Sequence, residues 1–416
     1  MRQPARLSLF LYLRIASLGF LAALSLFATA SPTAKQSTNA RAGAGAGAAN
    51  KANAHGFSTI VEPYGQIFPA FELASRALTQ KPASGTPNTF GAQDSLIGAS
   101  VVASKPNQAF ALTISAPGLL EPSTLSVQAP RAGQRYTLYP DLRWNVQALR
   151  AVKQPRTVTL TFELSSSDAR LAVRRVPVTL RSSNDVVFGV KDPTSNNILD
   201  FNWLFAAFVD EQSPAVVDIL AKSTASGVIK KFHGYAQNDE EEVYAQVFAI
   251  WHTLQRRGIR YSNLSPVTDS FKTQNVSSQY VRFVSETWAS QKANCVDASV
   301  LIASALKRAG LAPVLVVIPG HMLVGVALDA QGSQYAYLET TRLDGSQTAP
   351  AQGVGSGPSS KRSLHASLAN FEQALAQGQR QVDAAGTRFE TESDLSYQII
   401  DVQAARDLGV MPINRD

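Results

Sequence analysis

The hydrophobic periodicity of the chain changes once along its length, and this change constrains the fold most. From about residue 98 to 180, apolar residues alternate with polar ones, most clearly in the segment 158–164. A period of two is typical of strands with one buried face. After about Thr194 the period becomes 3.6, which is typical of amphipathic helices. The sequence therefore predicts an all-β domain over residues 57–193 and a mixed α+β domain over residues 194–416.

Within residues 57–193, short alternating runs are separated by turn-type clusters such as Ala116-Pro117-Gly118. Several short strands at this spacing favour an antiparallel β-sandwich of immunoglobulin-like type. We expect one of these strands over residues 142–148 and one short helix between Tyr64 and Leu78. No residue pattern in this domain indicates site chemistry.

The first 56 residues predict processing and a tether. Three arginines precede an apolar stretch over residues 15–27, and Ala28-Thr29-Ala30 follows. This is the three-part pattern of a secretory signal, with an apolar core shorter than the ~20 residues of a spanning helix. We expect a signal peptide over residues 1–30, a flexible low-complexity linker over residues 31–56, and a periplasmic or secreted protein. An uncleaved N-terminal anchor is the alternative.

Composition excludes several classes of function. The chain has 416 residues and a net charge of +7, which falls to +4 when the three leader arginines are removed. No basic run with interleaved aromatic residues is present, so we expect no nucleic-acid partner. The single cysteine excludes an intramolecular disulfide and a Cys-based zinc site. The five histidines show no zinc-ligand spacing and no nucleotide-binding glycine motif occurs, so we expect no metal and no cofactor.

In the second domain the sequence predicts two clear helices. One begins at Asp239, with Glu242 completing a capping box, and ends at Gly258; its acidic first turn indicates capping rather than a metal site. The other runs from Cys295 to Ala309. Three strands should follow, over residues 314–318, 323–328 and 335–338, and then a low-complexity surface loop over residues 346–362. A helix over residues 364–376 and a strand plus helix over residues 397–408 should complete the domain.

The lone cysteine is the most informative residue for function. A single cysteine is often a small buried hydrophobic residue, and this alternative stays open. However, an unpaired thiol in an exported protein risks oxidation, which suggests that Cys295 is needed. Cys295 also stands at the predicted start of a helix, where backbone N–H groups favour a thiolate.

A histidine and a carboxylate follow Cys295 on elements that can return beside it. His321 comes after a buried strand and a Pro-Gly turn, where it could act as a general base at the edge of a sheet. Glu339 ends a later strand, and a carboxylate beside an imidazole fixes its tautomer and stabilises the imidazolium. Alone, each is an ordinary turn histidine or strand-end acid. In this order, each at the end of an element, the three predict a catalytic triad.

These segments together resemble one family. The segment from Ala293 through Cys295 to Leu311 resembles the nucleophile helix of the transglutaminase-like superfamily, and the segment 319–324 is similar to its histidine strand. The segment 337–341 resembles the branch of bacterial exported transglutaminase-like cysteine peptidases whose triad ends in Glu-Thr-Thr. The run from Arg282 to the cysteine also resembles that branch. The resemblance covers roughly residues 207–345.

The resemblance implies a papain-like α+β core in which the cysteine helix packs on an antiparallel sheet. It implies that Cys295 is the nucleophile, His321 the general base and then acid, and Glu339 the orienting group in place of the more usual aspartate. Asn294 also departs from the family, where a glycine or small residue is common. The Cys295 N–H is one expected oxyanion donor, and the second is open among the side chains of Trp288, Gln291 and Asn294. Asp297 is expected to cap or pack the helix.

The expected function is therefore acyl transfer on amide bonds of a protein or cell-envelope substrate, through a thioester on Cys295. The residues leave hydrolysis and transamidation open. The alternative is a non-catalytic binding or assembly module of the cell envelope that keeps the transglutaminase-like fold, because fold alone does not fix activity.

Overall fold

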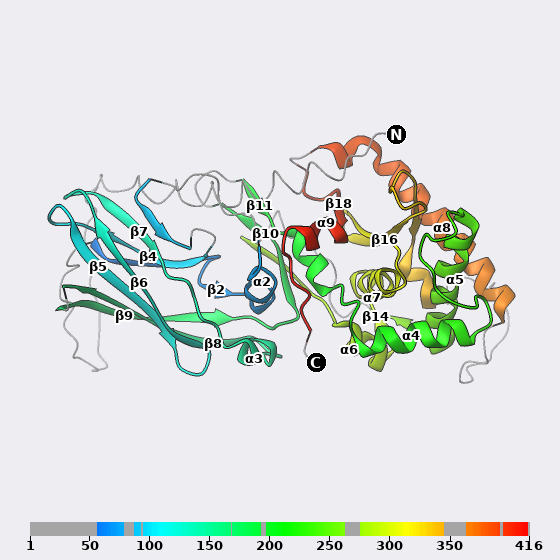
Figure 1. Ribbon diagram of the computed structural model, residues 1–416, viewed down its shortest axis with the longest axis horizontal. Coiled ribbons are helices and arrows are strands. Elements are labelled where there is room, and N and C mark those ends of the chain that lie inside the picture. Colours follow the sequence, from blue (N-terminus) through cyan, green and yellow to red (C-terminus); the bar gives the residue numbers. More distant parts are fainter. Residues whose placement is uncertain are drawn as a thin grey trace, which may run out of the picture.

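The structure is a computed structural model of the chain. It describes residues 56–78, 87–92, 95–167, 169–192, 197–262, 275–344, 363–391 and 394–414. The predicted signal peptide, the linker apart from Gly56 and the predicted loop over residues 346–362 lie outside the described residues. Figure 1 shows a β-rich half at one end of the molecule and a mixed helix-and-sheet half at the other.

Two sheets form the β-rich half. One has the strand order β1-β4-β7-β3 and the other β2-β9-β8-β5-β6. In both sheets the long strands pair antiparallel, and only the short β2 and β3 pair in parallel. Inward residues of both sheets belong to one hydrophobic core. The strands are β1 (Ser58–Val61), β2 (Gln66–Ile67), β3 (Thr89–Gly91), β4 (Ile97–Val102), β5 (Gln108–Ala116), β6 (Leu120–Ala129), β7 (Arg135–Tyr139), β8 (Arg156–Ser166) and β9 (Ala169–Leu180).

Of two local elements predicted for this half, the structure confirms one and contradicts the other. The expected short helix is α2 (Pro69–Ala74), inside the predicted interval. The strand expected over residues 142–148 is wrong, because α3 (Val146–Arg150) occupies its second part. Asn145 explains the difference: its side chain accepts a hydrogen bond from the Ala148 N–H and caps the helix. Only Leu149 of α3 is fully buried, so the alternating residues do not form the face of a sheet.

The mixed half is built on the antiparallel sheet β17-β16-β15-β18. Helix α7 packs on β15 and β16, and α8 packs on β17. The strands of this half are β12 (Arg260–Tyr261), β13 (Val276–Tyr280), β14 (Lys292–Ala293), β15 (Pro313–Ile318), β16 (His321–Ala327), β17 (Tyr335–Leu338) and β18 (Gln398–Asp401). The α-helices are α4 (Pro214–Ala225), α5 (Glu240–Arg257), α6 (Val284–Ser290), α7 (Cys295–Arg308), α8 (Leu364–Ala385) and α9 (Val402–Asp407), and the 3₁₀ helices are η3 (Asn202–Phe208), η5 (Thr340–Asp344) and η7 (Gly386–Glu390).

Helix α5 confirms the predicted helix but not its capping box. The Asp239 side chain accepts from the Glu241 N–H, and the helix ends at Gly258 in the left-handed conformation. Glu242 instead places its carboxylate 3.2 Å from Nε2 of His233. None of the helices in the described ranges combines the length and the apolar character that crossing a bilayer requires.

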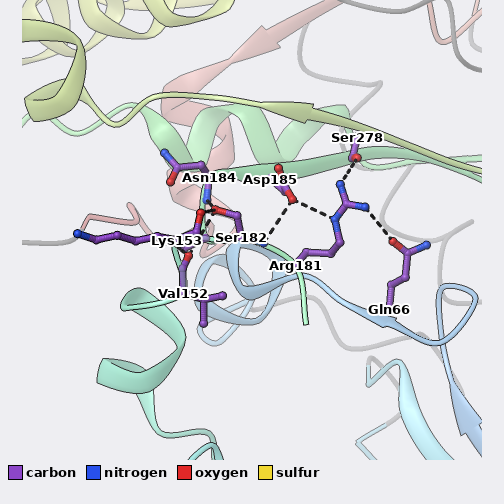
Figure 2. A network of polar contacts seen from close by, with 9 residues as sticks. Gln66, Val152, Lys153, Arg181, Ser182, Asn184, Asp185 and Ser278 are labelled. Carbon is purple, nitrogen blue, oxygen red and sulfur yellow. Dashed lines mark hydrogen bonds and ion pairs between the residues drawn. The ribbon is translucent and has the colours of Figure 1, made fainter. Parts of the chain in front are cut away.

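The joint between the halves follows β9. Strand β10 (Asp185–Lys191) lies in the segment that the sequence assigns to the β-sandwich, yet it pairs with β11 (Ile198–Asp200) and with β13 of the mixed half. Arg181 fixes this joint, as Figure 2 shows: its guanidinium donates to Asp185, Gln66 and Ser278.

The chain's end also crosses the joint. The Met411 N–H donates to the Ala74 carbonyl of α2, and the Ile413 N–H donates to the Ala207 carbonyl of η3. Both halves are thus tied by backbone and side-chain hydrogen bonds.

Candidate active site

Helix α7 begins at Cys295 because Asn294 caps it. The Asn294 side chain accepts from the Asp297 N–H at 2.8 Å, and the Asp297 carboxylate accepts from the Asn294 N–H at 3.0 Å. This is a reciprocal capping box, so the predicted capping role of Asp297 is confirmed. The start of α7 therefore depends on the Asn294 side chain. Cys295 is buried, with 3% of its surface exposed.

An ion pair holds the helix start against the segment between β13 and α6. Arg282 donates to Asp297 through its backbone N–H at 2.8 Å and through its guanidinium. Burial raises the pKa of the Asp297 carboxyl, and the hydrogen bonds from Arg282 and Asn294 act in the opposite direction. Arg282 therefore ties the segment after β13 to the start of α7.

His321 is positioned by a two-residue hairpin between β15 and β16. Ile318 pairs with His321 across Pro319 and Gly320. Gly320 has a φ of +70°, and proline followed by glycine in this conformation is the combination that a type II turn prefers. The turn fixes His321 as the first residue of β16, over the start of α7.

Glu339 is positioned at the end of β17 by helix α8. The Glu339 N–H donates to the Ala374 carbonyl at 3.1 Å. Gly378 lets the helix approach this closely, because a Cβ there would overlap the backbone carbonyl of Tyr337. The side chain of Glu339 is held within the core, where the residue is 1% exposed.

The two threonines after Glu339 have separate structural roles that the sequence analysis did not identify. Thr341 donates to Oε1 of Glu339 through its N–H at 3.0 Å and its hydroxyl at 2.7 Å. Thr340 donates from its hydroxyl to the Cys295 carbonyl at 3.3 Å. Thr341 therefore orients the Glu339 carboxylate, whereas Thr340 links the chain after β17 to the cysteine helix. The one sequence signal for these roles was the position of both threonines directly after Glu339.

His321 and Glu339 form a direct pair, with Nε2 of His321 2.8 Å from Oε2 of Glu339. Burial acts to lower the pKa of His321, but hydrogen bonds to Cys295 and Glu339, with their charges, raise it to about 10. Burial acts to raise the pKa of Glu339, but the hydrogen bond and charge of His321 and the hydrogen bonds from Thr341 lower it to about 2. At neutral pH the pair is therefore an imidazolium and a carboxylate.

The structure thus brings together all three residues singled out from the sequence. Since Glu339 takes Nε2, the nitrogen of His321 that remains for the Cys295 thiol is Nδ1. Ring orientation is assigned from this hydrogen-bond network. A thiol, an imidazolium and an orienting carboxylate in this order can perform nucleophilic acyl transfer.

Two of the three candidate oxyanion donors are engaged elsewhere. The Trp288 indole N–H donates to Asp218, and the Gln291 side-chain amide donates to the Arg257 carbonyl. Asn294 is also engaged, because its side-chain oxygen caps α7. Its amide NH2 group is the candidate that remains to assist the Cys295 N–H.

Tyr261 is a neighbour of the site that the sequence analysis missed. Strand β12 pairs in parallel with β14, so Tyr261 lies opposite Ala293, two residues before the cysteine. Burial and the charges of Cys295 and Glu339 raise the pKa of its phenol. No sequence pattern marked this tyrosine, because its proximity arises from the strand pairing alone.

A pocket of about 470 Å³, partly open to solvent, has His321 in its wall. Its other lining comes from β10, η3, β13, α7, the β15–β16 hairpin and the segment before β18. Apart from His321, no lining side chain carries a charge. The apolar lining side chains include Phe188, Phe205, Val296, Val317, Met322 and Leu395.

Within the described ranges, no group of three or more histidine, cysteine or acidic side chains could hold a metal ion. In comparisons with known proteins, the chain matches no protein-family model and no curated protein sequence.

Proposed function

We propose that this chain is an exported enzyme of the transglutaminase-like superfamily, which transfers acyl groups from amide bonds of a protein or cell-envelope substrate. The observation that carries the proposal is the His321–Glu339 pair of 2.8 Å, hydrogen-bonded onward to Cys295 at the start of a capped helix. Its export is an expectation from residues 1–30.

The proposed reaction has two steps. The Cys295 thiolate attacks the amide carbonyl, the carbon–nitrogen bond breaks, and the His321 imidazolium gives its proton to the leaving amine. His321 then takes a proton from water or from an amine, which attacks the thioester; the carbon–sulfur bond breaks, the acyl product leaves, and the Cys295 thiolate beside the His321 imidazolium is restored. Glu339 keeps the imidazole oriented and stabilises its charged form in both steps.

The pKa values of the pair support this assignment of roles. An imidazole whose pKa is raised to about 10 is protonated at neutral pH, so it is ready to act as the acid for a leaving amine. Its positive charge also stabilises a thiolate beside it. The start of α7 adds backbone N–H groups on the side where the oxyanion would form.

The finer fold assignments belong to the same proposal. A cysteine helix packed on an antiparallel sheet that carries the histidine and the acid supports a papain-like core. Two antiparallel-rich sheets that share a core support an immunoglobulin-like sandwich in the first half.

A non-catalytic binding module is the second candidate. The observation that favours it is the burial of Cys295, which is 3% exposed and which a substrate would have to reach. In that case the triad would be a structural network of the core.

Alkylation of Cys295 by iodoacetamide tests the proposal. In the wild-type protein we expect fast alkylation at pH 7. In His321→Ala the rate should fall at least about tenfold, because the imidazolium no longer stabilises the thiolate. The matched control is His365→Ala, since His365 lies at the start of α8, away from the site. A slow wild-type rate that His321→Ala leaves unchanged would exclude the enzyme and favour the binding module.

A further inference from the structure

The pocket beside His321 has the properties of a site for one side chain of the substrate. It is a partly open hollow whose empty space, including the part open to solvent, amounts to about 470 Å³. It reaches from the β15–β16 hairpin to the segment at Leu395 and Ser396. Because His321 forms part of its wall, a group inside the pocket lies beside His321.

The chemistry of the wall selects the occupant. The lining is mostly apolar and includes the aromatic rings of Phe188 and Phe205 and the aliphatic side chains of Val317 and Leu395. Asn202 and Gln279 contribute neutral amides, and Asn202 already donates to Asp200 and to the Leu395 carbonyl. His321, the one charged group among the described lining residues, is already paired with Glu339, so a charged side chain would lose hydration here without gaining an unpaired charge.

Two lining residues place the pocket next to Cys295. Val296 follows Cys295 directly on α7, and His321 contacts the thiol. An extended peptide whose scissile amide lies over the Cys295–His321 pair would thus place a neighbouring side chain within reach of the pocket.

We propose that this pocket binds a large apolar side chain adjacent to the scissile amide, so that the enzyme selects leucine-like or phenylalanine-like residues at that position. This inference rests on the proposed function. Val317 and Leu395 are the specificity-determining residues, since both line the pocket and neither belongs to the triad.

Peptide-like alkylating probes test the pocket without a known substrate. We would compare N-iodoacetyl-leucinamide, N-iodoacetyl-asparaginamide and N-iodoacetyl-glycinamide. In each, the Cys295 thiolate forms a carbon–sulfur bond and iodide leaves with the electron pair of the broken carbon–iodine bond. Leucine and asparagine have the same number and branching of side-chain heavy atoms, so the comparison tests mainly polarity. We expect the leucine probe to react roughly tenfold faster than the other two.

Variants of the lining residues test whether the preference for leucine arises in this pocket. Val317→Phe fills the pocket and should remove the preference for leucine, so that the leucine probe reacts no faster than the glycine probe. Leu395→Phe fills the pocket from the opposite wall, should do the same, and serves if the first variant does not fold. Ile399→Phe is the matched control, because Ile399 lies on the neighbouring strand β18 and does not line the pocket. It should keep the preference.

The outcomes separate this inference from the proposed function. Fast alkylation that depends on His321 but shows no preference among the probes would overturn the pocket assignment alone. A leucine preference that survives both Val317→Phe and Leu395→Phe would also overturn it. If even the glycine probe reacts slowly and independently of His321, the proposed function fails, and the pocket assignment fails with it.

Discussion

Nε2 of His321 lies 2.8 Å from Oε2 of Glu339, so this histidine turns Nδ1 toward Cys295. The carboxylate is itself held by two donors from Thr341 on its other oxygen. The ring therefore cannot rotate without breaking a charge-assisted hydrogen bond in the protein core. This makes the charge of His321 a measurable property of the site, independent of any substrate.

The titration of His321 should show this charge directly. We expect the ring to titrate with a midpoint near 10 in the wild-type protein, because Cys295 and Glu339 both raise the pKa. In Glu339→Gln the midpoint should fall by more than one pH unit, since one hydrogen bond and one charge are lost. The measurement is an NMR pH titration of the His321 ring carbons. A midpoint near 6.5 in both proteins would contradict the paired arrangement.

Stability should depend on pH through the same pair. The pKa of Glu339 is lowered from 4.5 to about 2, so its contribution is complete above pH 4.5 and is lost as the pH falls toward 2. The pKa of His321 is raised from 6.5 to about 10, so its contribution is complete below pH 6.5 and is lost as the pH rises toward 10.

The difference in unfolding free energy between wild type and Glu339→Gln should therefore be largest between about pH 4.5 and 6.5. At its maximum we expect roughly 2 kcal/mol, as for a buried hydrogen bond between charged groups. Urea denaturation at pH 3, 5.5 and 9 measures it. A difference that is equal at all three pH values would show that the pair is not charged in the folded protein.

Thr341 should act as a positioning residue for Glu339. Thr341→Val removes the hydroxyl that lies 2.7 Å from Oε1 but keeps the backbone donor. We expect the pKa of Glu339 to rise and the His321 midpoint to fall, with a loss of about 1.5–3 kcal/mol in unfolding free energy. Thr341→Ser keeps the hydroxyl and should preserve the midpoint. If Thr341→Ser and Thr341→Val shift the midpoint equally, the effect comes from packing rather than from the hydroxyl.

The elements that the sequence predicted well are those with strong local signals. Helices α5 and α7 carry apolar stripes, and α5 ends at a glycine and α7 just before one. The three site residues stood at the ends of predicted elements, which is why their order along the chain was informative. By contrast, alternation over residues 142–148 suggested a strand, and the cap at Asn145 makes a helix there. A single capping side chain outweighed a short periodic signal.

Local sequence patterns could not predict which strands pair over long distances along the chain. Strand β10 follows β9 in sequence, but its partners are β11 and β13. Tyr261 reaches the site only because β12 pairs with β14. The pocket likewise combines side chains from η3, β13 and β16, which no local pattern relates to one another.

Gly378 should be required by the contact between α8 and β17. In an ordinary helix, glycine to alanine stabilises by about 1 kcal/mol. Here Gly378→Ala should instead destabilise, by about 1–3 kcal/mol, because the new methyl group would meet the Tyr337 carbonyl. Thermal unfolding measures the sign. Gln379→Ala, at the next and exposed position of α8, should be nearly neutral. An increase in stability for Gly378→Ala would contradict the close approach that positions Glu339.

Breaking the ion pair between Arg282 and Asp297 should lower the unfolding free energy far more than breaking a surface pair of the same type. Its side chains are 12% and 0% exposed, whereas those of Arg170 and Glu163 are 66% and 36% exposed. Asp297→Asn leaves the guanidinium without its charge partner in the core, so we expect a loss of about 3–5 kcal/mol.

Glu163→Gln breaks the surface pair and should cost less than about 1 kcal/mol. Because Asp297 also accepts from Asn294 at the helix start, Asp297→Asn should slow the alkylation of Cys295 as well, while Glu163→Gln should not. Urea denaturation and iodoacetamide kinetics on the two variants make the comparison. Equal losses of stability would show that burial does not distinguish the pairs. A loss of about 3–5 kcal/mol with unchanged alkylation would show that the Arg282–Asp297 pair stabilises the fold without controlling the reactivity of the thiol.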